Sequence, residues 1–133
     1  MPSKPKVYFF YQNVQISLSN RSGIKKFIES VFRKERKSLA SINYIFVSDN
    51  ALLEINKQFL KHDFYTDIIT FDLSESEDII AEIYISIDRV RDNAKALGIS
   101  FKSEIHRVIF HGALHLCGFG DKTAPGCVIQ SMC

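Results

Sequence analysis

The stretch "EIYISIDRVRDNAKALG" (82–98) decides the fold class of this chain. Its first residues alternate glutamate, tyrosine and serine with isoleucine, which is the period-2 pattern of a strand buried on one face. Ser86 or Asp88 can then act as the N-cap of a helix, and Gly98 is the residue type that ends one. A buried strand that leads straight into a helix predicts a layered structure in which helices pack on a sheet.

The flanking sequence predicts further elements of both kinds. Ser100 can cap a long last helix. Two amphipathic helices are indicated closer to the N-terminus, one after Gly23 and one through 51–60 with Ser48 or Asp49 as its N-cap. We therefore expect an α+β fold with α/β-like layers, built on one mixed β-sheet of about four to five strands with helices packed on it. The other expected strands are "VYFFY" (7–11), "VQISL" (14–18), "SINYIFVS" (41–48) and "TDIITFDL" (66–73).

Length and composition predict a single domain over residues 1–133. The chain is 46% hydrophobic and 24% charged, with a formal net charge of +2. This balance is typical of a folded protein and argues against a disordered chain. The first amphipathic helix has a basic face that could contact phosphates, although a solvated surface is the interpretation we favour. The face consists of Lys25, Lys26, Arg33, Lys34, Arg36 and Lys37.

The cysteines and the apolar segments indicate where in the cell the protein is expected to be. The chain starts without an apolar stretch and cleavage site, and it contains no run of about 18 apolar residues, the length of a membrane span. An odd number of cysteines, Cys117, Cys127 and Cys133, without an export signal favours reduced thiols. We therefore expect a cytoplasmic protein that does not associate with membranes.

The segment "HGALHLCGFGD" (111–121) predicts a metal site on the last long helix. Helical positions four apart differ by about 40° in azimuth, so His111 and His115 project from one face and can reach the same cation. Gly118 ends the helix, so a third ligand has to come from beyond the turn, where Asp121 is the first suitable side chain. Two histidines and a carboxylate are an accepted zinc set. We predict one Zn²⁺ per chain at these three residues.

The spacing of two histidines is a weak signal by itself, so other interpretations have to be weighed. An isolated histidine is more often a core residue, which is the default interpretation for His62 and His106. The HExxH motif of zinc peptidases is absent, because Gly112 occupies the position of its glutamate. Cys117 lies about 200° around the helix from His115 and is predicted to be a buried free thiol that points away from the metal.

Three motifs in the right order resemble the YbeY family, the metal-dependent endoribonucleases of bacterial rRNA maturation. They are "EINKQFLKHDFYTDIITFDL" (54–73), "AEIYIS" (81–86) and "HRVIFHGALHLCGFGDK" (106–122). The family signature holds its metal with three histidines. The resemblance places two of them at His111 and His115, and the third falls on Asp121, the ligand that the helix geometry also indicates.

The chain departs from the family pattern at several positions: Asp121 replaces a histidine, Leu60 an arginine, Tyr65 a proline and Ala81 a glycine. The segment "TAPGCVIQSMC" (123–133) also differs from the charged helix that the family has there. Because Leu60 removes a guanidinium, the neighbouring Lys61 and His62 are the expected, weaker candidates for contact with RNA.

The resemblance implies a zinc-dependent hydrolase, a single-strand-specific endoribonuclease that takes part in rRNA processing and ribosome maturation. Its expected partner is RNA, either rRNA or a ribosomal subunit. Two alternatives stay open: a metal-binding, ribosome-associated factor with little catalysis, and a metallohydrolase of another substrate. The sequence assigns no catalytic side chain besides the metal ligands, and no oligomeric state.

Overall fold

A mixed sheet lies at the centre of the computed structural model, which describes residues 6–61, 65–118 and 128–130. Its strands follow the order β1-β2-β4-β3-β5. β1, β2 and β4 are parallel, whereas β3 is antiparallel to both of its neighbours. The expected α+β fold with one mixed sheet is confirmed. The strands are β1 (Val7–Tyr11), β2 (Ser38–Val47), β3 (Ile68–Asp72), β4 (Asp78–Ser86) and β5 (Val128–Gln130).

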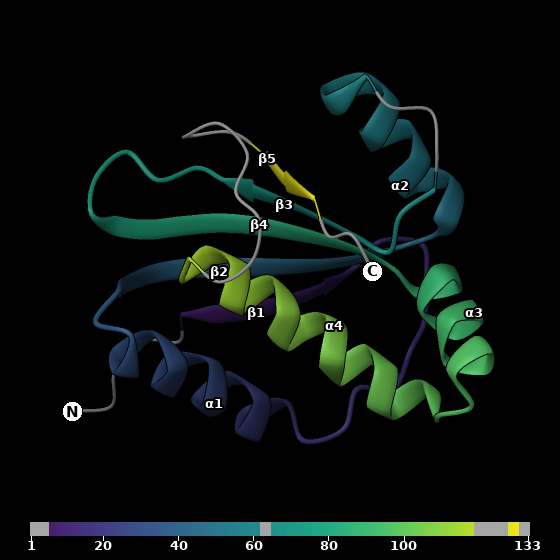
Figure 1. Cartoon of the computed structure of the whole chain (residues 1–133), viewed down its shortest axis with the longest axis horizontal. Coiled ribbons are helices and arrows are strands. Elements are labelled where there is room, and N and C mark those ends of the chain that lie inside the picture. The colour runs from purple at the N-terminus through teal and green to yellow at the C-terminus, as the bar shows by residue number, and fades with distance from the viewer. Residues whose placement is uncertain (1–5, 62–64, 119–127, 131–133) are drawn as a thin grey trace.

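The helices cover the two faces of this sheet unequally. Figure 1 shows α1 and α4 next to each other on one face and α2 on the opposite face. Within the described part of the chain, no helix is long and apolar enough to cross a membrane. The helices are α1 (Arg21–Lys34), α2 (Asp49–Ile55) with the π-helical continuation η1 (Asn56–Leu60), α3 (Ile87–Leu97) and α4 (Phe101–Leu116).

The main core lies between the sheet and the helices α1, α3 and α4. Ile83 and Ile85 of β4 are fully buried on this side, as the alternation in "EIYISI" predicts, and they pack with residues such as Ile28 of α1 and Ile109 of α4. A smaller cluster on the other face joins α2 to the sheet through Val47, Leu52 and Ile69. The sheet therefore carries α4, the helix of the two histidines, on its better-covered face.

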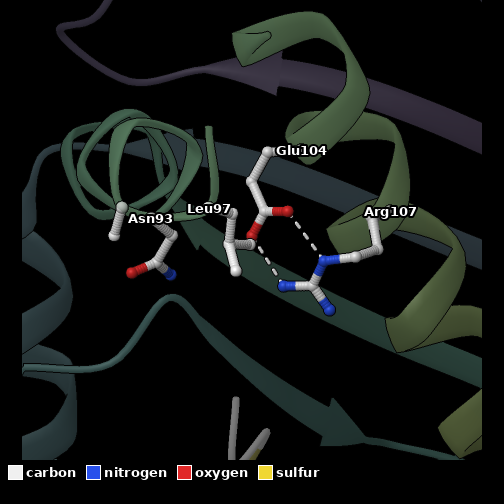
Figure 2. A pocket seen from close by; sticks show the side chains of 5 residues that line it. Asn93, Leu97, Glu104 and Arg107 are labelled. Atoms are coloured by element: carbon white, nitrogen blue, oxygen red, sulfur yellow. Dashed lines mark hydrogen bonds and ion pairs between the residues drawn. The ribbon is translucent and has the colours of Figure 1, made fainter. Parts of the chain in front are cut away.

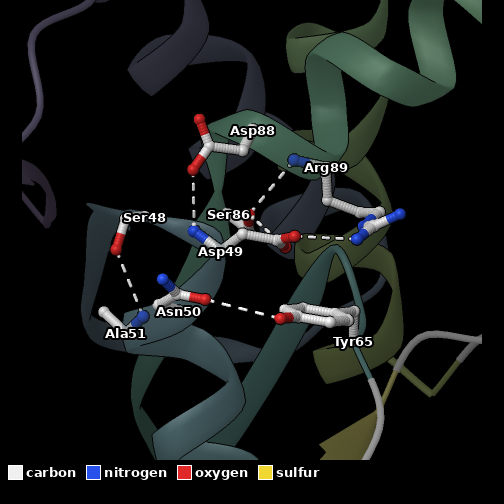
Figure 3. Close-up of polar contacts among 8 residues, drawn as sticks. All are labelled: Ser48, Asp49, Asn50, Ala51, Tyr65, Ser86, Asp88 and Arg89. Atoms are coloured by element: carbon white, nitrogen blue, oxygen red, sulfur yellow. Dashed lines mark hydrogen bonds and ion pairs between the residues drawn. The ribbon is translucent and has the colours of Figure 1, made fainter.

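Helix caps tie together the ends of the two central parallel strands. Ser48 accepts a hydrogen bond from the backbone of Ala51 to start α2, and Ser86 accepts one from Arg89 to start α3. Asp49 joins the two caps, since its carboxylate accepts a hydrogen bond from Ser86 Oγ at 3.0 Å and one from Arg89 Nη2 at 2.7 Å (Figure 3). This contact fixes the relative position of the strand ends.

Two expected elements differ in the structure. The strand expected at 14–18 is wrong, because this segment pairs with no strand in the described structure. Its alternating pattern arises because Leu18 is buried and Val14 and Ile16 pack against the main core along an extended connection. The helix expected at 51–60 starts at Asp49 and changes to π-helical geometry from residue 56.

Candidate metal centre

Helix α4 brings the two histidines of the predicted site together. It starts at its N-cap Ser100, whose hydroxyl accepts a hydrogen bond from the Ser103 backbone, and Gly118 follows its end with a φ of 101°. His111 and His115 lie one turn apart with their Nε2 atoms 2.8 Å from each other. Their ring centroids are 4.4 Å apart. Two imidazole nitrogens therefore converge on one point beside the helix.

Close packing against the sheet holds this part of α4 in place. A Cβ atom added to Gly112 would lie 3.0 Å from Ile68 Cδ1 and 3.1 Å from Ile83 Cδ1. One turn earlier, the buried Tyr44 hydroxyl donates a hydrogen bond to the Ile109 carbonyl oxygen at 2.9 Å. A side chain at 112 would require the ends of Ile68 and Ile83 to shift, so α4 lies close against the sheet at this point.

The surroundings of His111 favour an uncharged imidazole. His115 is buried, with 9% of its surface exposed. Burial lowers the pKa of His111, the positive charge of Arg107 lowers it further, and the negative charge of Asp67 acts in the opposite direction. A metal ion binds the neutral form of histidine. The two side chains fit a divalent transition metal, because imidazole nitrogens are suitable donors, the two Nε2 atoms lie close together, and the lowered pKa of His111 favours its metal-binding form.

Three charged residues beside the histidines were not found by sequence reasoning. Glu104 is completely buried on α4 and accepts two hydrogen bonds from Arg107, at 2.7 and 2.6 Å. Arg107 Nη2 also lies 4.0 Å from an oxygen of Asp67, which is 3% exposed just before β3. The i, i+3 spacing of Glu104 and Arg107 was a readable signal on a predicted helix. The approach of Asp67 depends on tertiary packing.

The other predicted site residues have different placements. Asp121 and His62 lie outside the described residues, and the third ligand and both RNA contacts, Lys61 and His62, stay predictions. Lys61 is exposed at the end of η1, with a φ of 57°. Among the described residues, no group of three histidine, cysteine or carboxylate side chains could hold a metal ion. The described structure thus contains two of the three proposed ligands.

The structure also places three other residues that the sequence analysis singled out. Cys117 is a free, buried thiol, as predicted, and it packs in the main core. Leu60 packs against the small cluster on the α2 face of the sheet, so this replacement of an arginine adds apolar contact there. His106 is half-buried, and its Nε2 has no hydrogen-bond partner in the described structure. The default interpretation of His106 as a satisfied core residue is therefore not supported by the described residues.

Comparison with known proteins gives consistent similarities over most of the chain. The family profile described as "Endoribonuclease YbeY" matches residues 9–126. A protein of that name from Cytophaga hutchinsonii is 48% identical over 118 residues, which are 88% of this chain and 82% of the relative. Another from Parabacteroides distasonis is 41% identical over 120 residues, or 90% and 84% of the two chains. The solution structure of a Thermotoga maritima protein superposes with a TM-score of 0.57 at 31% identity, covering 85% of this chain and 73% of the other.

Proposed function

Because this chain belongs to the endoribonuclease YbeY family, we propose that it cleaves single-stranded RNA with the help of a zinc ion and acts in the maturation of ribosomal RNA. The family assignment confirms the enzyme class expected from the sequence, a hydrolase that cuts RNA internally. The identity of the metal, the ribosomal substrate and a place of action in the cytoplasm are parts of the proposal. The convergence of His111 and His115 Nε2 is the observation that carries it.

We assign the metal to His111, His115 and Asp121. Both histidines come from one face of α4, which is rigidly packed on the sheet, and Gly118 at the end of the helix gives the chain the backbone freedom to turn back. A zinc ion in such a site would supply a bound water of lowered pKa and polarise a phosphoryl oxygen. The role of the protein is to lower the pKa of His111 and to direct the two imidazoles at one point.

The test of the metal site is metal content. The protein purified without added metal should contain about one equivalent of a divalent metal, which a His111→Ala, His115→Ala double variant should lose. Asp121→Asn should weaken binding because an amide is a poor, uncharged ligand, and Asp121→His should retain it. Equal metal affinity of Asp121→Asn and the parent would remove Asp121 from the ligand set.

The test of the activity is cleavage of an end-labelled, single-stranded RNA by the metal-loaded and the chelated protein. We expect cutting that depends on metal and is lost in the double histidine variant. The packing of Leu60 into an apolar cluster favours a second candidate, a ribosome-associated RNA-binding factor with little catalysis, because no guanidinium is available at that position. RNA binding without cutting would support this second function and refute the first.

A further inference from the structure

A pocket of about 450 Å³ lies between α3 and α4, one helical turn from the histidine pair. Figure 2 shows Asn93 and Leu97 of α3 on one side and Glu104 and Arg107 of α4 on the other. Its size is within the range of small-molecule sites, roughly 300–1,000 Å³. The pocket therefore has the dimensions of a binding site and a position next to the proposed metal.

Its place on α4 relates it directly to the proposed site of cleavage. Arg107, His111 and His115 follow one another at intervals of four residues, so they lie along one face of the helix. Neighbouring members of this row are about 6 Å apart along the axis. A nucleotide whose phosphate lies at the histidines can thus place an adjacent part of the same RNA strand at Arg107.

The charges in the pocket argue against a phosphate as its occupant. Glu104 engages Arg107 through two short hydrogen bonds and neutralises it, and Asp67 adds a second carboxylate 4.0 Å from the same guanidinium. Two carboxyl groups beside one guanidinium give this wall no excess of positive charge to attract a phosphate. A neutral group with N–H donors is compatible with this field.

The chemistry of the walls suits an uncharged ring with polar edges. The double hydrogen bond to Glu104 holds the plane of the Arg107 guanidinium, whose side chain is 42% exposed. Such planes are surfaces on which the bases of single-stranded RNA stack. Leu97 adds an apolar wall that is 61% exposed, and the Asn93 amide supplies both a donor and an acceptor at the edge.

From these observations we propose that the pocket between α3 and α4 binds a nucleobase of the RNA strand next to the cleaved phosphate. The base stacks between Leu97 and the guanidinium of Arg107, and its polar edge contacts Asn93. The inference rests on the proposed ribonuclease function, to which it adds a subsite for the substrate base. In this proposal Leu97 and Asn93 contact the base and take no part in binding the metal.

The test uses two variants that each replace an exposed leucine by a neutral polar residue. Leu97→Asn alters the pocket wall, and Leu73→Asn is the matched control, because Leu73 is 48% exposed in the connection that follows β3. Binding is measured by fluorescence anisotropy with a fluorescein-labelled single-stranded RNA and with an abasic strand of the same length, which keeps the ribose phosphates but lacks bases. Cleavage of the first strand is measured in parallel.

We expect the parent and Leu73→Asn to prefer the base-bearing strand, and Leu97→Asn to lose most of this preference, by about tenfold, as for a lost stacking contact. The affinity for the abasic strand should be the same in all three proteins. An unchanged preference in Leu97→Asn overturns the subsite. If the parent binds but does not cut, the ribonuclease proposal fails by itself, and the binding data still decide whether the pocket takes a base.

Discussion

The buried ion pair of α4 provides a strong test of the structure, because its two members are exposed so differently. Glu104 is completely buried, whereas 42% of the Arg107 side chain is exposed. Replacing Arg107 by methionine keeps much of the aliphatic packing but leaves the Glu104 carboxylate buried without its two donors. Replacing Glu104 by glutamine keeps its shape and leaves a guanidinium that water can reach.

These differences set the expected magnitudes. Breaking a buried pair by removing one partner costs about 3–5 kcal/mol, because the remaining charge is uncompensated. Water can enter where the exposed part of Arg107 was, so we expect Arg107→Met to lower the free energy of unfolding by about 2–3 kcal/mol. Glu104→Gln should cost about 1 kcal/mol, since the remaining charge can be hydrated. A Glu104→Leu, Arg107→Met double variant should recover part of this loss but not all of it, because the buried Asp67 still loses the guanidinium beside it.

Urea unfolding followed by circular dichroism measures all four proteins under one condition, with chelator present to remove any contribution of metal. The expected order is that Arg107→Met is the least stable, and that the double variant recovers part of the loss. If Arg107→Met costs no more than Glu104→Gln, the Glu104 carboxylate is not buried as described. Additive losses in the double variant would show that the two side chains do not interact.

Three further outcomes follow from the packing and titration of α4. Gly112→Ala should lower the free energy of unfolding by about 1 kcal/mol in urea, since the clash with the sheet exceeds the gain in helix propensity; a gain in stability would contradict the close approach. Burial raises the pKa of Cys117 to about 11, so in a Cys127→Ser, Cys133→Ser background the native protein should resist thiol labelling at pH 8 and react only when unfolded; rapid native labelling would contradict it. Burial lowers the pKa of His111 below its usual 6.5, so the folded state binds fewer protons than the unfolded chain, and the chelated protein should lose stability as the pH falls through and below 6.5. His111→Gln should flatten this dependence in urea titrations, and an unchanged slope would refute the assignment.

Local patterns predicted most of the elements. The alternation in 82–87 and the apolar spacing after Gly23 indicated β4 and α1, because burial on one face imposes a period on the sequence. Cap residues predicted helix starts at Ser86 or Asp88 and at Ser100 for the same local reason, and the structure has the caps at Ser86 and Ser100. The segment 14–18 shows the limit of this reasoning, because an extended chain packed on a core alternates like a strand without forming a ladder.

For the candidate site, too, the sequence predicted the local features and the tertiary structure decided the contacts between distant segments. The sequence by itself determined that His111 and His115 share a face, since four residues are about one helical turn, and family motifs identified the enzyme class. The tertiary structure alone decided that Asp67, nearly fifty positions upstream of the helix end, lies beside Arg107, and that Ile68 and Ile83 of the sheet pack closely against Gly112. Such contacts depend on how β3 and α4 pack across the core, and sequence periodicity reports the buried face of an element but not the neighbour that buries it.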